Sequence, residues 1–329
     1  MSKKAVKNEY IILGALIAAL LLYLVFKGTD KVHYRLPELK PIDVDALTGI
    51  EIAKPGQTIK LIKKDGLWWI DPLGYPVESS VITDITNNIK DLVLTDLASS
   101  SKNYTQYDLG KDKAIHVKAY RNEEVVRDFE LGKAASTYNH AFVKIKDDDR
   151  VYYGAQVFRV NFDKPLKEFR AKDVLKLDKN EISEIAVDMI KDGKKFLFTK
   201  TAKPAAANAS PVPPAQATEG EVAWTMPDGK EGNTATLDAV LAQLAALRCY
   251  DFIEGKKKED FNAPIYTVRL KGKKDYVLSI YEKPGGEQKG AAGESDMYPA
   301  VSSESPYPFL LNSYSVDMLM KKPEDLLKK

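Results

Sequence analysis

The stretch WIDPLG at residues 69–74 resembles the stretch WTMPDG at residues 224–229, and both fit the pattern W-x-x-P-x-G. We call the regions around them the first and the second copy. Trp69, Pro72 and Gly74 match Trp224, Pro227 and Gly229. A tryptophan at the end of a strand, followed by a Pro/Gly turn, fixes a hairpin against a helix by packing. An active site need not be duplicated, so we interpret these six residues as a structural repeat motif.

The similarity continues on both sides of this motif. Downstream, apolar residues at spacings of 3, 4 and 3 predict one buried stripe on an amphipathic helix in each copy: Ile82, Ile85, Ile89 and Leu92 match Leu237, Val240, Leu244 and Leu247. Asp96-Leu97 then matches Asp251-Phe252, and upstream the strand-like Ile50–Ile52 matches Ile185–Val187. Each copy predicts the order β-β-α-β-β-β-β-α. The expected fold class is therefore α+β, with two tandem repeats at 48–177 and 178–329, each an antiparallel sheet with one main amphipathic helix.

Trp68 has no counterpart in the second copy, where Ala223 precedes the matching tryptophan. Side chains alternate along a strand, so Trp68 and Trp69 must face opposite sides. An unpaired exposed tryptophan is a good interface anchor, which makes Trp68 a candidate partner contact. Cover by the segment that follows it is the alternative.

Residues 10–26 (YIILGALIAALLLYLVF) form an uninterrupted apolar run. This length predicts a short single-pass transmembrane anchor, with residues 1–9 as a cytoplasmic tail and 27–47 as a tether kept extended by Pro37 and Pro41. The alternative, a cleaved signal peptide, lacks a small-x-small site after the run. Lysines and arginines flank both ends almost equally, but long domains cross membranes regardless of charge. We therefore expect a protein of the bacterial inner membrane, with most of the chain in the periplasm or outside the cell.

The Ala/Pro-rich segment at 201–220 interrupts the second copy. It has almost no large apolar side chains and cannot bury enough surface to offset its ordering entropy. We predict a disordered insertion at a hairpin tip.

Composition and motifs give little sign of chemistry. The 49 basic and 47 acidic residues leave a net charge of only +2, which argues against nucleic acid as a partner. Cys249 is the single cysteine, and His33, His116 and His140 are widely spaced, so we expect no metal site. Asp147–Asp149 lacks the spacing of a calcium loop and is interpreted as a solvated hairpin tip. None of the common nucleotide-binding or hydrolase motifs occurs, and the sequence predicts a non-enzymatic protein without cofactors.

Four short motifs follow one another in a recognisable order: D-G-x-W at 65–68, Y-x-L-G at 107–110, L-G-K at 131–133 and F-R-x-K-x-V-L at 169–175. In this order they resemble the bacterial domain-of-unknown-function family 4340, most closely over residues 48–200. The resemblance implies a membrane-anchored envelope protein without established catalytic residues. It also implies proximity to ABC transporters of the gliding-motility type, beside whose genes members are often encoded.

Three functions remain open from the sequence. The leading hypothesis is a membrane-anchored extracytoplasmic accessory or scaffold protein that binds envelope partners such as ABC-transporter subunits. The second is an envelope hydrolase, or a carbohydrate- or peptide-binding enzyme, with a site between the two modules. The third is a structural assembly subunit that pairs through sheet edges.

Overall fold

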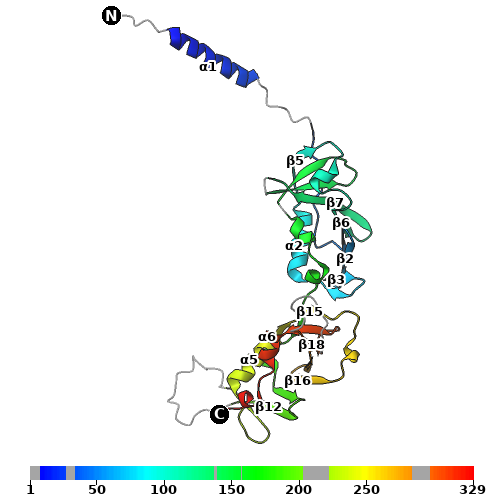
Figure 1. The fold of residues 1–329 in the computed structure, drawn as a ribbon, viewed down its shortest axis with the longest axis vertical. Helices are drawn as coiled ribbons and strands as arrows, with labels where there is room; N and C mark the ends of the chain where they lie inside the picture. The colour runs from blue at the N-terminus through cyan, green and yellow to red at the C-terminus, as the bar shows by residue number, and fades with distance from the viewer. Residues whose placement is uncertain (1–7, 27–33, 137–138, 157, 203–221, 284–296) are drawn as a thin grey trace, which may run out of the picture. The chain divides into compact units, whose positions relative to one another are not determined.

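The computed structural model describes residues 8–26, 34–136, 139–156, 158–202, 222–283 and 297–329. The chain divides into two compact units, Met1–Phe169 and Arg170–Lys329. Each unit contains one large antiparallel sheet together with short helices (Figure 1). Three of the predicted segments lie partly outside the described residues. These are the tail (residues 1–7), the tether (27–33) and the Ala/Pro-rich insertion, most of which falls within 203–221.

The first sheet has the strand order β4-β3-β2-β1-β6-β7-β8-β9-β5. Three helices, α2 to α4, and the 3-10 turn η1 accompany it. The elements are β1 (Gly49–Lys54), β2 (Gln57–Lys64), β3 (Leu67–Asp71), β4 (Tyr75–Pro76), α2 (Ser79–Lys90), β5 (Leu94–Ser99), η1 (Tyr104–Tyr107), β6 (Ile115–Arg121), β7 (Glu124–Ala134), β8 (His140–Ile145), β9 (Val151–Ala155), α3 (Arg159–Phe162) and α4 (Leu166–Phe169).

The second sheet has the order β13-β12-β11-β16-β17-β18-β19-β15, and a separate two-stranded ladder joins β10 to β14. The elements are β10 (Asp173–Lys176), η2 (Lys179–Glu181), β11 (Glu184–Met189), β12 (Lys194–Ala202), β13 (Val222–Thr225), α5 (Thr234–Ala245), β14 (Ala246–Arg248), β15 (Asp251–Phe252), η3 (Lys258–Asp260), β16 (Pro264–Lys271), β17 (Tyr276–Tyr281), β18 (Met297–Ser302), β19 (Phe309–Asn312), α6 (Ser313–Leu319) and α7 (Pro323–Leu326).

The two sheets have the same topology. From β3 to β5, the first sheet corresponds strand for strand to the second from β13 to β15. The antiparallel α+β prediction is confirmed, and the shared order agrees with tandem repetition.

The predicted element order was wrong in two places, because β3 and β13 are strands of their own before the main helix, and β5 and β15 follow it. These strands are short and lack a clean apolar alternation, the signal used to predict strands.

One helix in each unit buries an apolar stripe against the sheet. In the second unit all four predicted positions are buried, although only Leu237, Val240 and Leu244 belong to α5 and Leu247 lies in β14. In the first unit Ile85, Ile89 and Leu92 are buried as predicted, but Val81 takes the place assigned to Ile82, which is only half-buried. The helix is therefore rotated slightly from the predicted phase at its first turn.

The last short helix of each unit closes on the start of the main helix. Glu78, the N-cap of α2, donates its backbone N–H to the carbonyl of Phe169 (2.8 Å), and Asn233, the N-cap of α5, donates to Leu326 (2.8 Å). Phe169 and Leu326 are both fully buried. These matching bonds satisfy helix-end donors that would otherwise lack partners and show that α4 and α7 are equivalent.

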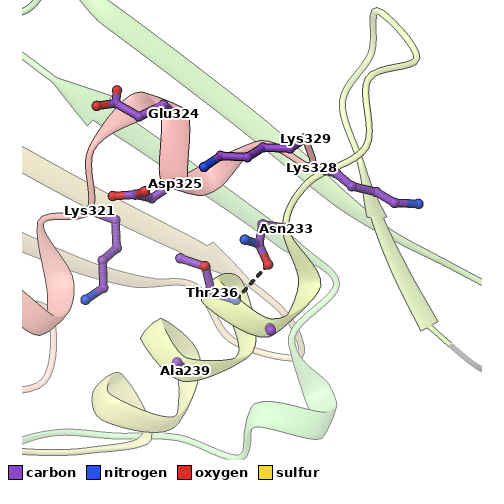
Figure 2. Close-up of a pocket in the computed structure, with 9 residues that line it drawn as sticks. Asn233, Thr236, Ala239, Lys321, Glu324, Asp325, Lys328 and Lys329 are labelled. Atoms are coloured by element: carbon purple, nitrogen blue, oxygen red, sulfur yellow. Dashed lines mark hydrogen bonds between the residues drawn. The ribbon is translucent and has the colours of Figure 1, made fainter.

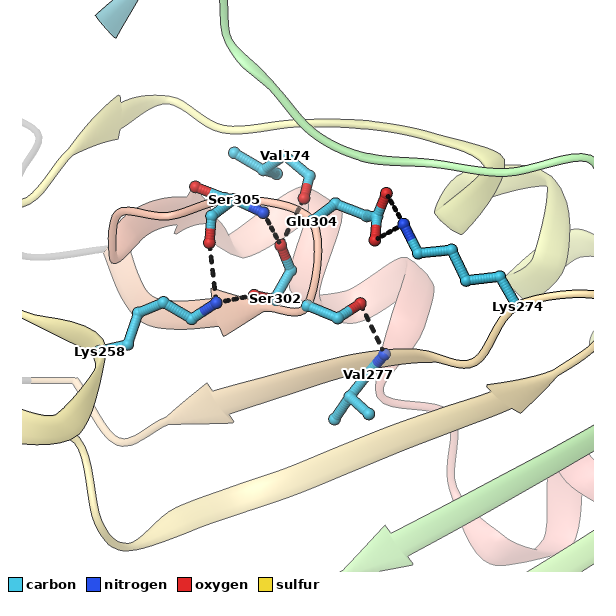
Figure 3. Close-up of polar contacts among 8 residues, drawn as sticks. Val174, Lys258, Lys274, Val277, Ser302, Glu304 and Ser305 are labelled. Carbon is cyan, nitrogen blue, oxygen red and sulfur yellow. Dashed lines mark hydrogen bonds and ion pairs between the residues drawn. The ribbon is translucent and has the colours of Figure 1, made fainter. Parts of the chain in front are cut away.

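The second unit begins at Arg170, ahead of the predicted border at residue 178. Strand β10 explains this position, since it pairs with β14. In addition, the Ser302 hydroxyl donates to the carbonyl of Val174 in β10 (Figure 3). Lys258 supports the same loop by donating to the carbonyls of Ser302 (2.6 Å) and Ser305 (2.9 Å). The β18–β19 loop is thus fastened to β10.

Helix α1 (Asn8–Phe26) covers the predicted anchor. Its large apolar side chains between Ile12 and Tyr23 are exposed. Within the part of the chain that the structure describes, no helix combines the length and apolarity required of a candidate membrane span. The transmembrane anchor stays a prediction.

Candidate functional site

The first sheet carries a line of apolar side chains on the face opposite its buried core, which we call the outer face. Ile50, Leu61 and Ile70 pair across three neighbouring strands and are buried on the core face. The register of the strands places the following residues side by side on the outer face: Pro76, Trp69, Ile62, Gly49, Tyr120 and Val125. We call this line the aromatic row.

Glycine at position 49 leaves room for an aromatic ring within this row. A Cβ atom there would lie 3.7 Å from both Cβ and Cδ2 of Tyr120. Trp69, Ile62 and Tyr120 are half-buried, and Val125 is 39% exposed. The row is therefore a low, partly accessible apolar strip.

A line of alternating charges runs beside the aromatic row on the same face. Its members, in order across the sheet, are Asp71, Lys60, Glu51, Lys118 and Asp128. Lys60 lies 3.7 Å from Glu51, and His116 Nε2 lies 2.5 Å from an oxygen of Asp128. An apolar strip bordered by paired charges has the composition of a protein-binding surface.

The second unit shows that the fold does not require these aromatic residues. The equivalent places on its outer face hold Thr225, Thr199, Glu184 and Lys271. The same strand order is thus built with a polar line where the first unit has Trp69, Ile62, Gly49 and Tyr120. We take the aromatic row as the candidate functional site because nothing in the shared architecture accounts for it.

The structure reverses the expected positions of the two adjacent tryptophans. Trp68 shares a strand face with buried Ile70, so it lies on the core side, while Trp69 lies on the outer face. Both are half-buried. Trp224 is 1% exposed and donates its indole N–H to Asp238 (3.2 Å). Of the two, Trp69 rather than Trp68 therefore faces away from the core of the unit.

The hydrogen bonds identify Trp68 as the true counterpart of Trp224. The carbonyl of Trp68 accepts from the N–H of Val77 (2.8 Å), and that of Trp224 accepts from Gly232 (2.7 Å). Val77 and Gly232 each stand immediately before the helix N-cap. The connection from strand to helix is one residue shorter in the second unit, and a gapless alignment therefore matched the wrong tryptophan.

The remaining motif residues form turns in both units. Gly74 and Gly229 have φ values of 73° and 84°, which side chains rarely adopt. Their N–H groups donate to Ile70 (2.7 Å) and Met226 (2.9 Å). Pro72 follows a cis peptide bond in the first unit. Pro227 lies in the turn after β13. These four residues, Pro72, Gly74, Pro227 and Gly229, thus belong to the turns, and none lies in the aromatic row.

A surface groove with a volume of about 630 Å³ lies at the start of α5. Figure 2 shows charged side chains of the C-terminal segment around it, among them Lys321, Glu324 and Lys328. The Asn233 side chain already accepts from the N–H of Thr236 (3.3 Å) at this helix end. The groove is open and of mixed charge, and we assign it no ligand.

A model of one protein family matches residues 68–264, which is more than half of the chain. The chain belongs to the DUF4340 family. The description of that family is "domain of unknown function", and the match runs from β3 of the first unit to the start of β16 in the second. No curated protein and no solved structure matches the chain. The resemblance to this family is confirmed.

Two DUF4340 motifs meet inside the first unit. A Cβ atom at Gly132, of the L-G-K motif, would lie 2.1 Å from the carbonyl oxygen of Tyr107, of the Y-x-L-G motif. Leu109 of the same motif packs in a buried cluster with Phe142 and Val151. The position of Gly132 therefore requires glycine for close approach of two backbone segments, and both motifs have structural roles.

A third DUF4340 motif, F-R-x-K-x-V-L, spans the border between the units. Phe169 is the buried last residue of α4, and Arg170 is the first residue of the second unit. The Arg170 side chain is 3% exposed and forms ion pairs with Asp251 (3.5 Å) and Glu254. The motif thus closes one unit and fastens the beginning of the other.

The acidic hairpin tip at 147–149 is held by neighbouring side chains. Arg150 donates to both carboxylate oxygens of Asp148 (2.9 and 2.8 Å), and the Tyr152 hydroxyl donates to one of them (2.7 Å). Asp149 pairs with Lys102 (2.5 Å). Among the described residues, no group of three or more potential metal ligands occurs.

We predict that Asp148→Asn lowers stability at neutral pH but not in acid. The bonds from Arg150 hold the pKa of Asp148 below its usual range, burial opposes this shift, and the bond from Tyr152 adds to it. A depressed pKa contributes stability above the ordinary value of about 4, and this contribution is lost as the pH falls toward the folded-state value. Urea unfolding of the wild type and the variant should therefore differ at pH 7 and converge below about pH 4.

Asp147→Asn is the control for this prediction, because Asp147 is exposed at the same hairpin tip. It should leave the free energy of unfolding nearly unchanged at both pH values. A difference between wild type and Asp148→Asn that stays constant from pH 7 to pH 3 would contradict the assignment.

Proposed function

We propose that this chain is a non-enzymatic, membrane-anchored accessory protein of the cell envelope that binds a partner protein through the aromatic row of its first unit. The observation that carries the proposal is the difference between the two outer faces. Trp69, Ile62 and Tyr120 occupy places that the second unit fills with Thr225, Thr199 and Lys271.

The chemistry of the row supports a protein partner. Tryptophan and tyrosine are the residues that most often dominate interface energies, because they bury a large area at low entropic cost. Lys60 and Glu51 lie at the border of the row and are already paired, so an incoming partner need not desolvate isolated charges there. The row would supply affinity, and the charges beside it would supply orientation.

Helix α1 supports the membrane part of the proposal. Each of its large apolar side chains from Ile12 to Tyr23 is more than half exposed. An apolar helix that no other part of the protein covers is unfavourable in water. An anchor would hold both units near the membrane and raise their local concentration next to a membrane partner. Membership of the DUF4340 family directs the search to ABC-transporter subunits, the partners that the family resemblance implies.

Photo-cross-linking in membranes tests the partner surface. A photoreactive residue replaces Ile62 of the aromatic row, and the control carries the same residue at Thr199, the equivalent place in the second unit. We expect cross-links from position 62 to an envelope protein, with ABC-transporter subunits first in line, and none from position 199. Equal cross-linking from both positions, or none from position 62, would remove the aromatic row from the proposal.

Carbonate washing tests the anchor separately. We expect the full chain to stay in the membrane pellet and a chain that starts at residue 34 to be released into the supernatant. Recovery of the full chain in the supernatant would refute the anchor while leaving the cross-linking result intact.

A further inference from the structure

The segment from Tyr34 to Leu47, which we call the strap, lies against the first unit. The Tyr34 hydroxyl accepts from the N–H of Leu97 in β5 (3.2 Å). The carbonyl of Lys40 accepts from Arg127 in β7 (2.7 Å), and that of Asp45 accepts from Lys63 in β2 (2.9 Å). The described part of the predicted tether is thus docked along the unit by a few contacts.

Arg127 is a buried cation without a counter-ion. Its residue is 7% exposed, and its Nε has no hydrogen-bond partner in the part of the chain that the structure describes. Among the same residues no carboxylate lies within 4.0 Å of the guanidinium, which donates to the Lys40 carbonyl. Burial accordingly lowers its pKa. A buried guanidinium held by a neutral carbonyl is a costly arrangement.

The second unit shows that this place in the fold can be apolar. Arg127 pairs with Ala119, which faces Ile50 of the central strand. The equivalent central residue, Ile185, faces Leu270, and Leu270 pairs with Tyr276. An aliphatic and an aromatic residue therefore suffice at this position. The arginine, together with the small Ala119 that makes room for it, needs another explanation.

A groove opens beside the strap close to Arg127. A groove of about 380 Å³ lies between strap residues 40–43 and the residues at the β6–β7 turn, including Arg121 and Val125. Asp43 and Glu124 also line it. Solvent can therefore enter beside the strap segment whose carbonyl Arg127 binds.

We propose that Arg127 is a recognition site for an oxyanion, a carboxylate or a phosphate, and that the strap covers this site until it lifts. A guanidinium binds these groups through two parallel charge-assisted bonds, which a single carbonyl cannot replace. An oxyanion bound to the uncovered Arg127 shifts the strap toward its lifted state, because it has affinity for that state alone. Lifting the strap would also free Leu97, at the open edge of β5, from the Tyr34 hydroxyl.

Limited trypsin digestion of the full chain in detergent tests this proposal. Arg35 is the tryptic site within the strap, since Lys40 is followed by Pro41, and cleavage after Arg35 reports on lifting. We expect sodium phosphate to accelerate this cleavage several-fold over sodium chloride at equal ionic strength. Sodium acetate as a third arm distinguishes carboxylate from phosphate, and acceleration by either salt fits the site.

Two variants decide the outcome. Arg127→Met keeps an unbranched, though shorter, side chain that cannot hold an oxyanion, so phosphate should have no effect on the cleavage of this variant. Arg121→Met removes an exposed arginine from the same groove, paired with Glu124 at 2.6 Å, and should respond like the wild type. Equal acceleration in Arg127→Met, or no acceleration of the wild type by either phosphate or acetate, would overturn the proposal.

Discussion

Trp224→Ala should destabilise the second unit by about 3–5 kcal/mol, the usual cost of truncating a buried large aromatic residue. Trp224 is 1% exposed, and its indole N–H bonds to Asp238 on α5. The truncation leaves a cavity between β13 and the helix and removes the donor to Asp238. Hydrogen exchange of amides in β12 and α5, followed in increasing urea, measures the loss in this unit separately from the other.

Trp69→Ala is the matched control, although the gapless sequence alignment treats the two tryptophans as equivalents. Trp69 lies on the outer face, and its truncation should cost no more than about 1 kcal/mol of stability while weakening partner cross-linking. Trp68→Ala, on the core side, should lie between the two. Equal losses for Trp69→Ala and Trp224→Ala would restore the sequence alignment and exclude the register described above.

Gly132→Ala should destabilise the first unit by about 3 kcal/mol, at the upper end of the range for overpacking. The added methyl group would lie 2.1 Å from the carbonyl oxygen of Tyr107, and backbone cannot move aside as a flexible side chain can. Gly49→Ala is the control within the same sheet. Its nearest atoms would be 3.7 Å away, so it should stay within about 1 kcal/mol of the wild type.

Thermal and urea unfolding, monitored by exchange of amides in β6 and β7, compares the two glycine variants. A neutral Gly132→Ala would mean that the Tyr107 segment relaxes. The Y-x-L-G and L-G-K motifs would then need an explanation other than close backbone approach.

The sequence predicts the interior of this protein better than its outer surface. The stripe from Leu237 to Leu247 and the paired strands around Ile50 and Ile185 follow from periodicity alone, because burial imposes it. The face of Trp69 depends on how β3 pairs with β2, and a one-residue change in a turn exchanges the two faces. The sequence did contain one signal for the correct face: Trp68 and Ile70 are two residues apart, so Trp68 must share a face with an apolar residue suited to the core.

The aromatic row could not be predicted from the sequence, for a related reason. Its members come from six strands, β4, β3, β2, β1, β6 and β7, and they become neighbours only through the strand order of the finished sheet. The docking of the strap was not predicted, because Pro37 and Pro41 indicate only an extended chain, and an extended chain can lie on a surface as readily as in solvent. Arg127 lies far from the strap in sequence, and no local pattern connects them.

The junction of Phe169 and Arg170 should make the connection between the two units resistant to proteolysis. A single peptide bond separates a fully buried aromatic residue of the first unit from a nearly buried cation of the second. Because both residues are buried, a protease finds no exposed linker to attack at this bond. Hydrolysis would also leave a new carboxylate and a new ammonium group at two interior positions. Cutting the chain at this point would therefore damage both units at once.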